Sequence, residues 1–225
     1  MAIFAIAMGF LEAIVVVYIR ELYYPEGFSF PLELLPPRIF AIELVREFST
    51  MIMLLSIGFL IGRSALEKFS WFLFSFGVWD IFYYVALKIF LDWPESLLTW
   101  DILFLIPITW IGPVLAPLIC SLTMIFFALT VFTGSQAPKK IISVFWYTIL
   151  LGAILIFSSF IFDYTRLLIG EGYFSRGGPS LLKPGFTKAM LNYMPEKFQW
   201  GLFIAGELLI FSSIAGFVFI SKKKN

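Results

Sequence analysis

The sequence Glu43-Leu-Val-Arg46-Glu47-Phe-Ser-Thr50 runs directly into the apolar segment Met51-Ile-Met-Leu-Leu-Ser-Ile-Gly-Phe-Leu-Ile61. The apolar part is suited to a membrane, whereas the charged part is suited to water. Positions 43, 46, 47 and 50 follow the i, i+3, i+4, i+7 spacing, so a helix places them on one stripe. This stretch therefore predicts a membrane helix whose polar stripe needs partners from other helices.

The composition of the whole chain agrees with a membrane protein. Of its 225 residues, 60% are hydrophobic, 20% are aromatic and only 14% are charged, and the mean hydropathy is +0.95. Such a chain has too little polar surface to coat a soluble globule, so we predict an all-α polytopic integral membrane protein. The 16 basic and 15 acidic residues nearly balance, which argues against a nucleic-acid partner.

The chain has no histidine and a single cysteine, Cys120. The lack of histidine excludes His-ligated zinc, His-ligated haem and catalysis by a Ser-His pair. A lone cysteine excludes an internal disulfide, and we interpret Cys120 as a packing residue. We expect no cofactor.

A bilayer core about 30 Å thick needs about 20 helical residues. This length divides the sequence into six candidate spans, at roughly 2–20, 38–63, 69–91, 114–133, 141–162 and 200–221. We expect one transmembrane helical domain over residues 1–225, with a long extracytoplasmic loop at 163–199. The first span lacks a basic n-region and carries Glu12, so we expect it to be retained rather than cleaved.

The 33 residues from 101 to 133 are apolar, which is too long for one span. Pro107, Gly112, Pro113 and Pro117 all lie in the first half, so we predict a proline-broken re-entrant or interfacial segment at 101–113 before a regular span. We expect this segment to cover the bundle as a lid. Residues 92–100 are predicted to form a short surface helix.

The lysines and arginines of the short loops indicate the orientation. Arg63, Lys68, Lys139, Lys140 and the lysines at 222–224 all belong to the side that holds both termini. Because such residues mark the cytoplasmic side, we expect a multi-pass protein of the cell membrane with both termini in the cytoplasm.

With that orientation, five intramembrane carboxylates fall in the outer half of the bundle, roughly 8 to 16 Å deep at 1.5 Å per helical residue. A charge left in lipid costs on the order of 3 kcal/mol, so these groups are expected to face one polar chamber. Its predicted members are Glu12, Glu43, Arg46, Glu47, Thr50, Asp80, Tyr84 and Glu207. Arg20, Lys88 and Asp101 are its expected partners at the outer edge, although Asp101 is favoured as a helix N-cap beside Trp100.

Five carboxylates against one deep arginine leave a surplus of negative charge, which protons or a bound cation would neutralise. Carboxylate ligands without histidine suit Mg²⁺, Ca²⁺, Mn²⁺ or a monovalent ion better than zinc or copper, and no metal is assigned. The alternative is a purely structural ion-pair network that sets helix register.

Three functions remain open on the sequence. The first is a membrane subunit or accessory protein that handles protons or cations, or that anchors a partner in a membrane complex. The second is an intramembrane enzyme for a lipid or lipid-linked substrate, with Glu47 or Asp80 as the base, Arg46 holding an anionic group and segment 101–113 gating access. The third is a structural scaffold. The expected partners are membrane lipids, with other membrane subunits or a second copy as further candidates.

Overall fold

The computed structural model describes residues 1–33, 35–133, 139–170 and 193–222. Within these ranges lie six helices long and apolar enough to cross a membrane. They are α1 (Ala2–Tyr23), α2 (Pro37–Ile61), α3 (Ala65–Leu91), α4 (Leu115–Thr133), α5 (Lys139–Gly170) and α7 (Trp200–Lys222). The described chain is thus predominantly helical, with the multi-pass character that the sequence predicts.

Helix α3 is the centre of the first four helices, because α1, α2 and α4 all pack against it. Glycines allow this close packing. A Cβ on Gly9 of α1 would come within 2.6 Å of the Trp79 carbonyl oxygen, and one on Gly77 of α3 within 2.6 Å of the Ser121 carbonyl oxygen. These backbones approach as closely as small residues permit in membrane helix pairs.

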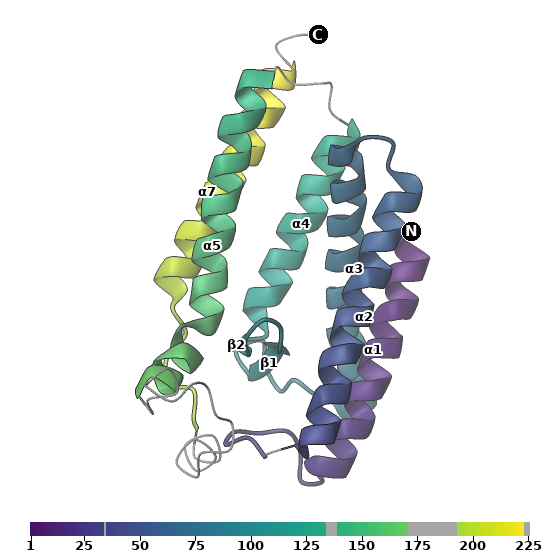
Figure 1. Cartoon of the computed structure of the whole chain (residues 1–225), viewed down its shortest axis with the longest axis vertical. Helices are drawn as coiled ribbons and strands as arrows, with labels where there is room; N and C mark the ends of the chain where they lie inside the picture. Colours follow the sequence, from purple (N-terminus) through teal and green to yellow (C-terminus); the bar gives the residue numbers. More distant parts are fainter. Residues whose placement is uncertain (34, 134–138, 171–192, 223–225) are drawn as a thin grey trace.

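Helices α5 and α7 form a separate pair (Figure 1). Gly152 and Gly206 lie where they cross, and a Cβ on either would meet the other's carbonyl oxygen at 2.6–2.7 Å. The pair contacts the rest of the bundle through α4 and the strand β2. Helix α1 begins and α7 ends toward the same end of the bundle (Figure 1).

The segment predicted to be broken by proline is a β-hairpin. Strands β1 (Trp100–Phe104) and β2 (Trp110–Pro113) pair antiparallel, with Asp101 opposite Gly112 and an irregularity between Ile102 and Phe104. The prediction of non-helical backbone in this segment is confirmed, and it takes the form of two short strands within an otherwise helical bundle. Aromatic and β-branched residues around the prolines favour strands, and pairing satisfies backbone groups that would otherwise be exposed in a membrane.

The predicted surface helix at 92–100 is also wrong. Helix α3 ends at Leu91, its C-cap residue Asp92 has a left-handed φ of 50°, and turns follow. The side chains of Ser96 and Thr99 accept hydrogen bonds from the nearby amides of Leu98 and Ser96. Such local hydroxyl bonds compete with helix formation.

The predicted loop at 163–199 begins later than expected, because α5 continues to Gly170. Tyr164 and Leu168 stay on a buried helix face and pack against Ile111 of β2 and Tyr193. The charges of Asp163 and Arg166 suggested a loop. Both residues lie in α5, outside the buried face that holds Tyr164 and Leu168. Residues 171–192 of the predicted loop lie outside the described residues.

Candidate functional site: a polar chamber beside α3

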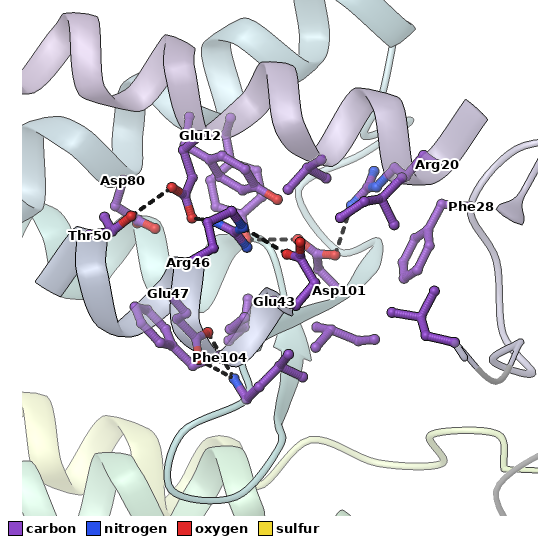
Figure 2. A pocket seen from close by; sticks show the side chains of 18 of the residues that line it. Glu12, Arg20, Phe28, Glu43, Arg46, Glu47, Thr50, Asp80, Asp101 and Phe104 are labelled. Carbon is purple, nitrogen blue, oxygen red and sulfur yellow. Dashed lines mark hydrogen bonds and ion pairs between the residues drawn. The ribbon is translucent and has the colours of Figure 1, made fainter. Parts of the chain in front are cut away.

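Side chains from α1, α2, α3 and β1, together with neighbouring loop residues, line a half-open cavity of about 140 Å³, called here the polar chamber. All the predicted chamber residues except Glu207 line it, as do Arg20 and Asp101 from the predicted edge set. Figure 2 shows these side chains converging from the helices. The chamber lies beside the first half of α2, where the polar stripe of that helix faces α1 and α3.

Arg46 is the central cation of the chamber. Its Nε donates to Glu43 Oε2 at 2.7 Å, and its Nη1 donates to Glu12 Oε1 (Figure 2). The second oxygen of Glu12 accepts a hydrogen bond from Thr50 Oγ1 at 3.0 Å. Arg46 of the α2 stripe therefore pairs with Glu43 of the same stripe and with one glutamate of α1, so these charges are not left in lipid.

Glu47 bonds to the hairpin and not to Arg46. Both of its carboxylate oxygens accept the backbone N–H of Leu105, at 2.9 and 3.1 Å. Leu105 comes directly after β1, so this bond fixes the hairpin turn to α2. An amide at the end of a strand would otherwise lack a partner.

Asp101 is almost fully buried, with 1% of its surface exposed. It accepts hydrogen bonds from Arg20 Nη2 at 3.0 Å and from the Tyr84 hydroxyl at 3.1 Å. Burial raises the pKa of Asp101 above its ordinary value, and the Arg20 guanidinium and the Tyr84 hydroxyl partly offset that rise. The N-cap interpretation is wrong because a strand, not a helix, begins at Trp100.

The Arg20 guanidinium lies between two aromatic rings. Its Cζ is 4.3 Å from the centre of the Phe28 ring and 3.8 Å from that of Trp93. Cation–π contacts of this kind stabilise a desolvated guanidinium. Arg20 is therefore held at this edge of the chamber by two aromatic rings and the Asp101 carboxylate.

Asp80 lies at the opposite side of the chamber. Its Oδ2 accepts a hydrogen bond from Ser121 Oγ of α4 at 2.7 Å. Asp80 also lines a second, larger cavity together with Leu103 and Phe104, so these three residues form a wall shared by both.

Two predicted members lie elsewhere. Lys88 bonds the Asp92 carboxylate at 2.7 Å and the carbonyls of Asp92 and Pro94 at 3.1 Å, at the exposed end of α3. Glu207 accepts a hydrogen bond from Thr123 Oγ1 at 2.8 Å and lines the second cavity. It lies apart from the chamber because α7 pairs with α5 rather than with α1 or α2.

Sequence reasoning missed Tyr83, Ser121 and the Leu105 amide. Tyr83 lines the chamber three residues after Asp80, so helical spacing could have identified it. Ser121 is the partner of Asp80 from another helix, and no local pattern in the sequence links them.

The chamber holds five carboxylates, from Glu12, Glu43, Glu47, Asp80 and Asp101, and two guanidinium groups, from Arg20 and Arg46. Five minus two leaves three negative charges if every group is ionised. In the described part of the chain, no three acidic or cysteine side chains are arranged to hold a metal ion. The arrangement can accept protons on carboxylates that lack a cationic partner.

Comparisons with protein-family models, with curated proteins and with solved structures give no match for this chain.

Proposed function

We propose that this protein is an integral membrane subunit that binds and releases protons in the polar chamber, alone or within a membrane complex. One observation carries the proposal: five carboxylates share a cavity of about 140 Å³ with only two arginines. Ionisable residues within a membrane bundle commonly serve proton pathways.

The electrostatic cost of full ionisation supports proton binding. At an effective dielectric constant of about 20, two like charges about 5 Å apart repel by about 3 kcal/mol. Protonating the surplus carboxylates removes this repulsion together with the cost of desolvating each charge. The chamber also has room for several water molecules, which can relay protons between the carboxylates.

The directions of the carboxylates favour protons over a metal ion as the neutralising species. Glu43 and Glu12 face Arg46, Glu47 faces the Leu105 amide, and Asp80 faces Ser121. A calcium or magnesium ion needs several oxygens directed at one point. A proton needs only one carboxylate.

Infrared spectroscopy of the protein in lipid tests the proposal. We expect an absorption band from protonated carboxyl groups at pH 7 that weakens as the pH is raised. Asp80→Asn and Glu47→Gln are each expected to reduce this band, whereas the exposed control Glu95→Gln leaves it unchanged. If the folded wild-type protein shows no protonated carboxyl groups at pH 7, proton binding is contradicted, and the chamber is a purely structural ion-pair network.

The proposed orientation places both termini in the cytoplasm and has its own test. Starting from Cys120→Ala, a cysteine replaces Arg63 or Glu95, two exposed residues at opposite ends of α3. An impermeant thiol reagent added to intact cells is expected to label Glu95→Cys and not Arg63→Cys. The opposite labelling pattern would show that both termini lie outside the cytoplasm.

The second candidate function is an enzyme for a lipid or lipid-linked substrate. It is favoured by the wall that the polar chamber shares with the second, apolar cavity, since an amphipathic substrate could reach both. Incubation with native lipid extract, followed by mass spectrometry, tests it. Turnover that Asp80→Asn abolishes supports the enzyme, and unchanged lipids argue against it.

A further inference from the structure

The second cavity has a volume of about 600 Å³ and is called here the apolar cavity. Helices α2, α3, α4, α5 and α7 and the hairpin all contribute to its walls, which are mainly aromatic and aliphatic. Its volume lies within the roughly 300–1,000 Å³ typical of ligand sites. Because it lies between helices of membrane-spanning length, its ligand would enter from the lipid phase.

Glu207 places an unusual polar group in this cavity. Its side chain is 7% exposed, and its Oε2 accepts a hydrogen bond from Thr123. Its Oε1 is buried and has no nitrogen or oxygen donor among the described residues, and the Cys120 thiol beside the carboxyl group is only a weak donor. Buried polar atoms in native proteins are nearly always hydrogen-bonded, so Oε1 marks where a donor belongs.

Trp110 adds a second unpaired group at the wall of the same cavity. Its indole Nε1 is buried and, within the described chain, has no acceptor. Its ring stacks on Phe160 at 5.8 Å and meets Phe157 edge-on at 5.0 Å. The cavity therefore combines a flat aromatic wall with one acceptor and one donor.

We propose that the apolar cavity binds one neutral membrane lipid whose hydroxyl group donates to Glu207 Oε1 and whose oxygen atoms can accept from Trp110 Nε1. A hydroxyl supplies the donor that the carboxylate lacks, and an apolar body matches the walls. A membrane acylglycerol and a membrane quinol both have this chemistry. The proposal does not depend on proton binding in the polar chamber, because Glu207 and Trp110 lie outside it.

Two matched pairs of probes test the hydroxyl and distinguish its sources. The first pair is a monoacylglycerol and the fatty acid methyl ester of the same chain. The second is a quinol and its dimethyl ether. Each is added to the purified full chain, and bound molecules are counted by native mass spectrometry. We expect one molecule per chain, with the hydroxyl-bearing member of one pair binding about tenfold more tightly than its partner.

Variants locate the site. Glu207→Leu is expected to abolish the difference in affinity between the hydroxyl-bearing probe and its matched partner without a hydroxyl. Ala153→Phe fills the cavity from α5 and is expected to remove binding, whereas Ala205→Phe, at an exposed position of α7, leaves it intact. Circular dichroism checks that each variant is folded.

Equal binding of both members in both pairs overturns the proposal, as does wild-type binding by folded Ala153→Phe. Preference within the glyceride pair identifies an acylglycerol, and preference within the quinol pair identifies a quinol.

Discussion

The polar chamber and the apolar cavity lie on either side of one wall, formed by Asp80, Leu103 and Phe104, yet they differ in every other respect. The chamber is about 140 Å³ and contains the buried Arg20 and the half-buried Arg46, whereas the cavity is about 600 Å³ and contains two carboxylates. In the chamber, Arg20, Arg46 and the Leu105 amide bond four of the five carboxylates. In the cavity, Asp80 accepts a hydrogen bond from one hydroxyl, and Glu207 accepts one from a hydroxyl beside the weak thiol donor Cys120. Charges in this bundle gather where several elements can satisfy them, and a lone carboxylate is left partly unsatisfied.

The chamber depends most on Arg46, so Arg46→Met is expected to have the largest effect. It leaves Glu12 and Glu43 without their cation, and breaking a buried pair costs about 3–5 kcal/mol. The free energy of unfolding in mixed micelles measures this loss.

The exposed Arg63→Met is the matched control, with an expected change within about 0.5 kcal/mol. Adding Glu12→Gln and Glu43→Gln to Arg46→Met should recover much of the stability. Equal unfolding free energies for the two single variants would show that the Arg46 pairs contribute nothing.

Phe104→Ala is expected to join the two cavities and to lower the free energy of unfolding by about 2 kcal/mol, less than for a fully buried aromatic ring because Phe104 is half-buried. Its ring stacks on Phe76 at 5.9 Å and lies 5.6 Å from Trp110. Water from the chamber should then reach Cys120, which lines the apolar cavity.

A thiol reagent in solution measures that access, because Cys120 is the single cysteine of the chain. We expect faster labelling in Phe104→Ala than in wild type, and no change in Phe219→Ala, whose side chain is 71% exposed. An unchanged labelling rate in Phe104→Ala shows that another group separates the two cavities.

Glu47→Leu should lower the free energy of unfolding by about 1–3 kcal/mol, because it leaves the Leu105 amide without its acceptor. Glu47→Gln keeps an acceptor oxygen and should cost less. Hydrogen exchange at residues 105–109 measures the difference directly. If both variants exchange like wild type, Glu47 does not fix the hairpin turn.

The smallest effect is expected at Asp92, outside both cavities. The hydrogen bond and charge of Lys88 hold the pKa of Asp92 below its ordinary 3.8. The stability that this pair contributes is therefore present above about pH 4 and is lost as the pH falls through the lowered pKa.

Asp92→Asn keeps a residue that tolerates the left-handed φ of 50°, so it isolates the charge. Unfolding curves of the two proteins should differ slightly at pH 7 and coincide at low pH. A difference that grows as the pH falls would contradict this assignment.

The sequence was sufficient to predict the helices and the polar stripe, because both follow from spacing along one chain segment. Depth from the membrane surface was also informative, since Glu12, Glu43 and Asp80 all line one chamber. Depth does not fix lateral position, however. Glu207 was assigned to that chamber from its depth, yet α7 lies beside α5 and faces Thr123.

The hairpin shows a different limit. Prolines in 101–113 excluded a regular helix, but they did not distinguish a broken helix from two strands. Asp101 illustrates the consequence. A broken helix would make it a surface N-cap, whereas the hairpin makes it a buried partner of Arg20. Only the pairing with Gly112 across the strands places it inward.

The separation in sequence between paired polar groups has a consequence for biogenesis. Glu12 leaves the ribosome 34 residues before Arg46, and Asp80 leaves it 41 residues before Ser121. Thr123 is synthesised 84 residues before its partner Glu207. Because an unpaired charge is costly in lipid, α1 should remain beside the insertion machinery until α2 arrives, and α3 until α4 does. The last helix, by contrast, enters a membrane in which Thr123, the hydroxyl partner of its Glu207, is already in place.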